Sequence, residues 1–142
     1  MKTIGGKFMK LKKSYKGFVL WMIVFCLICE GIIFLPIKDK NILCRLVLIF
    51  CVIATTFLTY MIYKTEYVYW YSGANYEDAV NVSSERRKIY AKKHFNRFMF
   101  FTALYIIYSI ISQLLGIYFW IDIIVCTVSF VIVAISTTNI KL

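Results

Sequence analysis

Residues 45–63 read RLVLIFCVIATTFLTYMIY and contain one charged side chain, that of Arg45. Apolar residues follow one another without interruption from Leu46 to Phe50, whereas a membrane β-strand alternates polar and apolar residues. A helix of about 20 apolar residues crosses the roughly 30 Å of hydrocarbon, because it rises about 1.5 Å per residue. Residues 45–63 therefore predict a transmembrane helix.

The same pattern predicts three further spans, at residues 18–35, 98–115 and 117–135. Hydrophobic residues make up 61% of the 142-residue chain and charged residues 17%, whereas soluble domains contain about 45–50% and about 25%. This composition excludes a soluble domain, and a single proline with six glycines excludes a collagen-like or disordered chain. We expect an all-α polytopic protein, residues 1–142 forming a single membrane domain with four transmembrane helices in a bundle.

Basic residues indicate how the spans are oriented, because positively charged segments stay in the cytoplasm. The arm at residues 1–17 carries lysines and no acid, and the loop at residues 64–97 carries most of the remaining basic residues. Both segments lie on one side of a four-span protein, which predicts cytoplasmic N- and C-termini and a multi-pass protein of the cell membrane. The first span could instead be a cleaved signal peptide, but Glu30 interrupts it and no small-x-small site follows Leu35. An uncleaved anchor is favoured.

The loop at residues 64–97 begins with tyrosines and a tryptophan, typical of side chains at the headgroup level. Ser83 or Ser84 can cap a helix that has Glu85 in its first turn and continues into the third span. We expect basic residues of this helix to contact anionic lipid headgroups or a partner. They are Arg86, Arg87, Lys88, Lys92, Lys93 and Arg97. The alternatives are a solvated loop and a binding surface for a partner or nucleotide.

Polar residues inside an apolar span are costly and suggest a function. Glu30, Arg45, Gln113 and Asp122 lie near the outer ends of the predicted spans, and we expect all of them to share one polar layer. Such a layer could clamp the helices together, handle protons or cations, or consist of side chains that reach the surface separately. Spacing of small and hydroxyl residues predicts an inward-facing polar seam on every helix, which would let the backbones approach closely.

Catalytic motifs are absent from the sequence, so we expect no enzyme activity and no cofactor. His94 is the only histidine, and no metal-ligand spacing surrounds it. Cys26 and Cys29 form a CxxC, as in membrane thiol oxidoreductases of the vitamin K epoxide reductase type. Those enzymes need a second, loop-borne cysteine pair, whereas the outer loop here offers Cys44 alone. Nucleic-acid binding is not expected, because the net charge of +10 is divided among membrane-flanking segments.

Two families resemble parts of the chain. Residues 72–76, SGANY, and 83–90, SSERRKIY, lie between one helix and two closely connected helices. This arrangement, from the second span to the C-terminus, resembles an uncharacterised family of small bacterial polytopic membrane proteins, which implies membrane residence. The chain is also similar to small multidrug resistance transporters in having four spans and an acid in the first, a role that Glu30 would take.

These observations favour a bacterial accessory subunit or immunity-type protein that acts by helix contact with a membrane protein partner or as a homodimer. Abundant Lys, Ile, Asn and Tyr indicate an AT-rich bacterial source. The competing hypothesis is a proton-coupled transporter of small molecules or cations that uses Glu30 as its carboxylate.

Overall fold

The structure is a computed structural model that describes residues 11–71 and 73–142. Every regular element in these residues is helical: α1 (Lys16–Ile33), α2 (Lys40–Thr65), the 3₁₀ turn η1 (Val68–Trp70), α3 (Tyr76–Asn81), α4 (Ser84–Leu114) and α5 (Phe119–Thr138). Four of them, α1, α2, α4 and α5, are long and apolar enough to cross a membrane. The prediction of an all-helical chain with four candidate spans is therefore confirmed.

Helix α4 is longer than a membrane requires. Ser83 caps it by accepting a hydrogen bond from the backbone N–H of Arg86 at 3.3 Å, and Glu85 lies in its first turn. The helix then continues without a break for 31 residues, about 46 Å at roughly 1.5 Å per residue. This confirms a capped helix that runs into the third span. A bilayer's hydrocarbon is only about 30 Å thick, so the third span predicted from Phe98 covers only the second half of α4.

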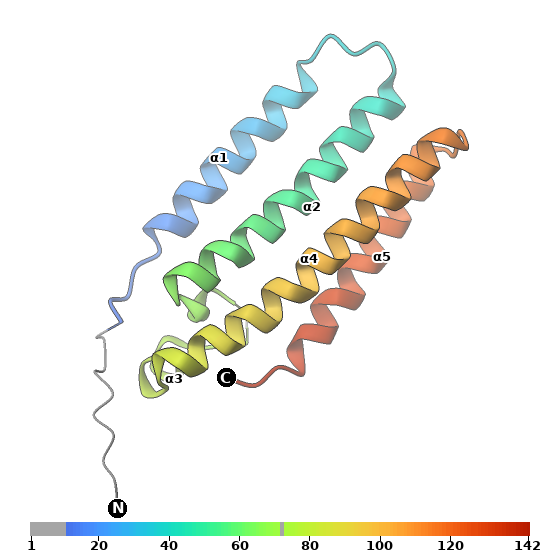
Figure 1. Cartoon of the computed structure of the whole chain (residues 1–142). Helices are drawn as coiled ribbons and strands as arrows, with labels where there is room; N and C mark the ends of the chain where they lie inside the picture. The colour runs from blue at the N-terminus through green and yellow to red at the C-terminus, as the bar shows by residue number, and fades with distance from the viewer. Residues whose placement is uncertain (1–10, 72) are drawn as a thin grey trace, which may run out of the picture.

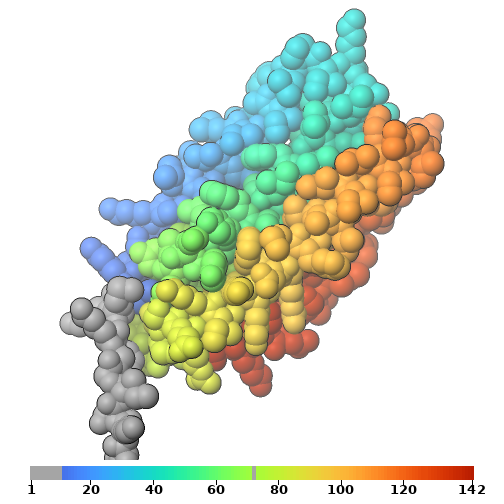
Figure 2. Space-filling view, in the orientation of Figure 1, coloured from blue at the N-terminus to red at the C-terminus, as the bar shows by residue number. Residues whose placement is uncertain are grey.

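Helix α2 lies in the middle of the molecule, with α1 on one side, α4 on the other and α5 next to α4 (Figure 1). Buried residues occur on α2, α4 and α5, but α1 has none. The space-filling view accordingly shows α1 along one edge of the molecule, separated from α4 by α2 (Figure 2). The expected four-helix bundle is thus a three-helix bundle with α1 attached to its edge.

Aromatic rings attach α1 to the long helix α2 and to the 3₁₀ turn η1. Phe25 stacks on Phe50 with ring centroids 5.7 Å apart, and Phe18 lies 5.8 Å from the ring of Trp70. An apolar groove of about 480 Å³ remains between the two helices. Since α1 is apolar on nearly every side, with Glu30 as its one acid, no single stripe of its surface has to be buried in protein.

A four-residue connection, residues 115–118, turns the chain from α4 into α5. Gly116 adopts a positive φ of 66° there, and the N–H of Ile117 bonds the carbonyl of Ser112 at 3.0 Å. Glycine is favoured because a left-handed conformation costs an L-residue about 1–2 kcal/mol.

Gly116→Ala is expected to lower the free energy of unfolding by about 1 kcal/mol. An added Cβ would meet no atom within 4 Å, so the cost is conformational. Gly31→Ala is the control, because Gly31 is helical and equally open; it should stabilise α1 by roughly 0.5–1 kcal/mol. Unfolding in mixed micelles, followed by circular dichroism, measures both. Equal effects of the two substitutions would contradict this account.

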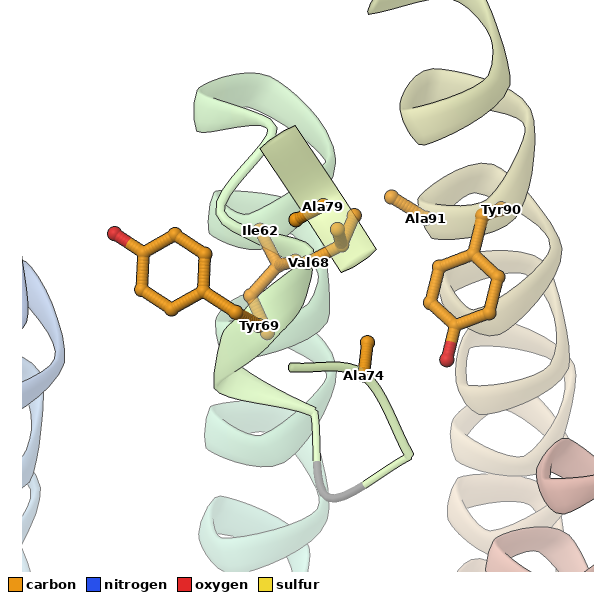
Figure 3. Packing of buried hydrophobic residues seen from close by; sticks show 7 residues of the cluster. All are labelled: Ile62, Val68, Tyr69, Ala74, Ala79, Tyr90 and Ala91. Carbon is orange, nitrogen blue, oxygen red and sulfur yellow. The ribbon is translucent and has the colours of Figure 1, made fainter. Parts of the chain in front are cut away.

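The end of the molecule that carries α3 also carries residues 11–15 and the C-terminus (Figure 1). We call it the basic end, because the basic residues of α4's first turns lie there. Its core consists of Ile62, Val68, Tyr69, Ala74, Ala79, Tyr90 and Ala91. Figure 3 shows Tyr90 on α4 facing the segment that bears Ala74, with Ala79 close to Ile62 and Val68. Residues 66–71 and 73–83 therefore form a cap across the ends of α2 and α4.

Both chain ends are tied to this cap. The carbonyl of Ser14 accepts hydrogen bonds from the Tyr69 hydroxyl at 2.9 Å and from Trp70 Nε1 at 3.1 Å. The Tyr76 hydroxyl donates to the carbonyl of Leu11 at 2.5 Å, and Ile140 packs against the same core. The rest of the predicted basic arm, residues 1–10, lies outside the described residues.

Candidate functional site

The guanidinium of Arg45 joins α2 to α4 and α5. Its Nε lies 2.6 Å from Oδ2 of Asp122, and its Nη1 donates to Oε1 of Gln113 at 2.5 Å. Nη2 donates to Oγ of Ser112 at 3.2 Å and also to the carbonyl of Ile117. We call these five residues the Arg45 cluster. One side chain of α2 thus holds both helices and the turn between them.

Asp122 is fully buried, with an exposed fraction of 0%, and Arg45 is 4% exposed. The second oxygen of the carboxylate, Oδ1, accepts a hydrogen bond from Ser112 Oγ at 2.5 Å. Asp122 also lies in the first turn of α5, where the helix dipole stabilises a negative charge. Oδ1 therefore has a hydrogen bond, whereas Oδ2 has Arg45 Nε as an ion-pair partner without a hydrogen bond among the described residues.

Local sequence brings these groups together. The turn at Gly116 folds α5 back along α4, which sets Asp122 beside Ser112. Arg45 lies in the second turn of α2, on the side that meets α4. The predicted layer of Arg45, Gln113 and Asp122 is therefore present as a set of direct contacts. Ser112 and the Ile117 carbonyl are further members that sequence spacing did not assign to it.

Glu30 does not join this layer, contrary to the prediction. Its side chain is exposed, and α1 ends at Ile33 rather than Leu35, so Glu30 lies about one turn from the end of its helix. The reason is the position of α1 at the edge of the molecule, with α2 between it and α5. Glu30 shares the outward face of α1 with Val19, Ile23, Cys26 and Ile33, all of them exposed.

Polar seams face the protein interior on three of the four long helices. Buried positions include Thr59 on α2, Ser109 on α4 and Cys126 on α5. Thr56 and Thr102 link α2 to α4 through hydroxyls 2.6 Å apart. The predicted inward seam is confirmed for these helices and is wrong for α1, where no residue is buried.

A second buried ion pair lies at the basic end. Arg87 Nη2 and Nε donate to Glu66 Oε2 at 2.9 and 3.1 Å, and Arg87 Nη1 donates to the carbonyls of Ala79 and Val82 at 3.0 and 2.7 Å. Ser84 Oγ donates to the other oxygen of Glu66 at 2.7 Å. This pair fastens α2, α3 and α4 together.

Arg87 was predicted to contact headgroups, but it is only 3% exposed. Sequence reasoning missed the partner, Glu66, which follows α2 in a left-handed conformation with a φ of 60°. The sequence signal that could have indicated this partner is the position of Glu66 directly before the tyrosine-rich segment. The other basic residues of the predicted set, Arg86, Lys88, Lys92, Lys93 and Arg97, are exposed.

Burial raises the pKa of the Glu66 carboxyl, but the hydrogen bonds from Ser84 and Arg87 outweigh burial and hold the pKa below its ordinary value. Glu66 is therefore charged at neutral pH. Lys88, whose Nζ lies 3.4 Å from Glu66 Oε1, adds a weaker attraction because it is exposed.

The two ion pairs are built to hold helices in place. Within residues 11–71 and 73–142, no group of three or more His, Cys, Asp or Glu side chains could hold a metal ion. All five cysteines are free thiols. The arrangement leaves α1 as the one long helix without buried residues and Glu30 as an exposed acid on it. Comparisons with protein-family models, with curated proteins and with solved structures find no match for the chain.

Proposed function

We propose that this chain is a non-enzymatic accessory or immunity-type protein of a bacterial cytoplasmic membrane, which acts by contact between α1 and a transmembrane helix of a partner protein. The observation that carries the proposal is the outward face of α1, with Glu30 among apolar residues. The positions of Val19, Ile23, Cys26, Glu30 and Ile33 differ by alternating steps of four and three, the repeat with which helices pair side by side.

Glu30 supports a helix as the occupant of this face. A carboxyl at the edge of hydrocarbon is costly unless a partner supplies a hydrogen bond or a positive charge. The two buried acids of the described residues are both paired: Asp122 with Arg45 and Glu66 with Arg87. Glu30 remains as the intramembrane acid whose side chain faces outward.

We further propose that the basic end faces the cytoplasm. Arg86, Lys88, Lys92, Lys93 and Arg97 are exposed there, and each basic residue close to anionic lipid contributes about 1 kcal/mol of attraction. Membrane lipids with anionic headgroups would then hold this end, while α1 is free to meet its partner within the bilayer.

Photo-crosslinking tests the contact. A benzophenone amino acid at Leu27, on the outer side of α1, should form adducts with a membrane protein in native membranes. The same amino acid at Ile124 on α5 is the control, because both side chains are 62% exposed. Mass spectrometry of the protein purified in mild detergent should find the adduct partner at fixed stoichiometry. Equal adducts at both positions, or adducts to lipid alone, would contradict the proposal.

Glu30→Gln sharpens this test. Removing the charge should reduce adduct formation at Leu27 by about threefold to 18-fold, since a polar contact between membrane helices contributes roughly 0.6–1.7 kcal/mol. Glu85→Gln, which removes an exposed acid at the basic end, should leave it unchanged. An adduct of twice the chain's mass would identify the partner as a second copy.

A further inference from the structure

At the basic end, the last turns of α2 and α5 and the first half of α4 line a cavity of about 610 Å³. The segment around η1 and Ile140 of the C-terminal tail border it as well. Cavities of about 300–1,000 Å³ hold small organic molecules. None of the described side chains that line this one carries a formal charge, and most are aromatic, aliphatic or threonine.

His94 is the most polar ring in the cavity wall. It is 4% exposed and stacks on Tyr71, with ring centroids 4.3 Å apart and planes at 21°. Its Nδ1 lies 3.1 Å from the carbonyl of Tyr90. A carbonyl can only accept a hydrogen bond, so Nδ1 carries the proton.

Burial lowers the pKa of His94, which keeps the ring neutral at pH 7. In the neutral ring with a proton on Nδ1, Nε2 holds a free lone pair and can only accept a hydrogen bond. Among the described residues, the structure gives Nε2 no hydrogen bond of its own. His94 therefore offers the cavity an acceptor.

Tyr71 provides the complementary group. Its hydroxyl is buried without a hydrogen-bond partner in the described part of the chain, and burial raises its pKa, so it keeps its proton. The hydroxyls of Thr59 and Thr137 already donate to the carbonyls of Thr56 and Ala134, which leaves their oxygen atoms as acceptors. A ligand hydroxyl can donate to the acceptor on His94 and accept from the Tyr71 hydroxyl at once.

We propose that this cavity binds a neutral lipid whose head group is a hydroxyl, with the hydroxyl at His94 and Tyr71 and the hydrocarbon chain against Phe98 and Ile135. Anionic lipids and fatty-acid carboxylates are disfavoured, because no cation lines the cavity to offset the loss of hydration. The cavity contains no residue of α1, so the outcome of its test does not depend on the proposed partner contact.

A photoreactive long-chain alcohol tests the proposal. The full chain is reconstituted into phosphatidylcholine vesicles with hexadecanol that bears a diazirine in its chain, and labelled peptides are mapped by mass spectrometry. Labels should fall on α4 near Phe98 and on α5 near Ile135, and unlabelled hexadecanol should compete for them. Hexadecyl methyl ether cannot donate a hydrogen bond and hexadecanoate is charged, so both should compete at least threefold less well. Equal competition by the ether would overturn the role of Nε2.

Two substitutions assign the hydrogen bonds. His94→Phe keeps a ring for stacking and removes the acceptor, and Tyr71→Phe removes the donor. Each should weaken hexadecanol binding by about threefold to tenfold, the value of one hydrogen bond. Tyr60→Phe removes a hydroxyl from an exposed tyrosine that does not line the cavity, and it should have no effect.

Tyr71→Phe also separates binding from folding. Because the lost hydroxyl has no partner in the described residues, the substitution should leave thermal stability unchanged or raise it. Unchanged competition by hexadecanol in both His94→Phe and Tyr71→Phe would overturn the proposal, and so would labelling spread evenly over the lipid-facing surfaces.

Discussion

Arg45→Met is expected to lower the free energy of unfolding by about 3–5 kcal/mol, the usual cost of removing one partner of a buried ion pair. The substitution leaves the carboxylate of Asp122, which has no exposed surface, with Ser112 as its remaining hydrogen-bond donor. It also removes the contacts from α2 to Gln113 and to the Ile117 carbonyl. The measurement is reversible unfolding in mixed micelles, followed by circular dichroism.

The double variant Arg45→Met/Asp122→Leu distinguishes an unpaired charge from lost packing. Replacing both partners by apolar residues should recover most of the loss, because buried ion pairs and apolar side chains of similar size are nearly equivalent in stability. Lys92→Met, at an exposed basic residue, should change stability by no more than about 0.5 kcal/mol. A loss below about 1 kcal/mol for Arg45→Met alone would show that the cluster does not clamp the helices.

Arg87→Met is expected to release the cap formed by residues 66–71 and 73–83, at a cost of about 3 kcal/mol. Arg87 makes two hydrogen bonds to Glu66 and two to the carbonyls of Ala79 and Val82. All these partners belong to the cap or to its connection with α2, so the loss should be local. Hydrogen exchange measured by mass spectrometry should show faster exchange in residues 66–83 and little change in α5.

The same pair predicts a pH dependence with a definite sign. The pKa of Glu66 in the folded chain lies below its ordinary value of 4.5. Its contribution is therefore fully present above about pH 4.5 and is lost as the pH falls through the lower, folded-state pKa. Acidification in that range should speed exchange in the cap of the wild-type chain. Glu66→Gln should abolish this part of the dependence and Glu85→Gln should not; an unchanged profile in Glu66→Gln would contradict the assignment.

Local features of the sequence predicted most of the elements. The length and hydropathy of each apolar segment were enough to predict the four long helices. Ser83 and Glu85 indicated the start of α4, because a capping residue acts within one turn of the helix end. Helical spacing found the buried seams, since small and hydroxyl residues recur on one side of α2, α4 and α5. Helix ends were displaced by a few residues, which hydropathy does not resolve.

The site was predicted in part. We predicted one polar layer for Arg45, Gln113 and Asp122, because all three lie near the same ends of the predicted spans. In the structure, Arg45 contacts both of the others. Glu30 also lies near the outer end of its span, yet it is not in the layer. The position of a residue along its helix does not determine which neighbouring helix its side chain faces. The pairing of Glu66 with Arg87 spans a non-helical segment whose path no periodicity describes.

The sequence by itself determined that the chain is helical, that four helices have the length and apolarity of membrane spans, and which faces of three of them carry polar residues. These properties depend on residues within a few turns of one another. Tertiary structure alone decided that α1 lies at the edge with Glu30 outward, that Arg87 is buried against Glu66, and that His94 and Tyr71 line one cavity. The reason is physical: these outcomes depend on how helices distant in sequence pack against one another, and an apolar helix has no single face that fixes its neighbour.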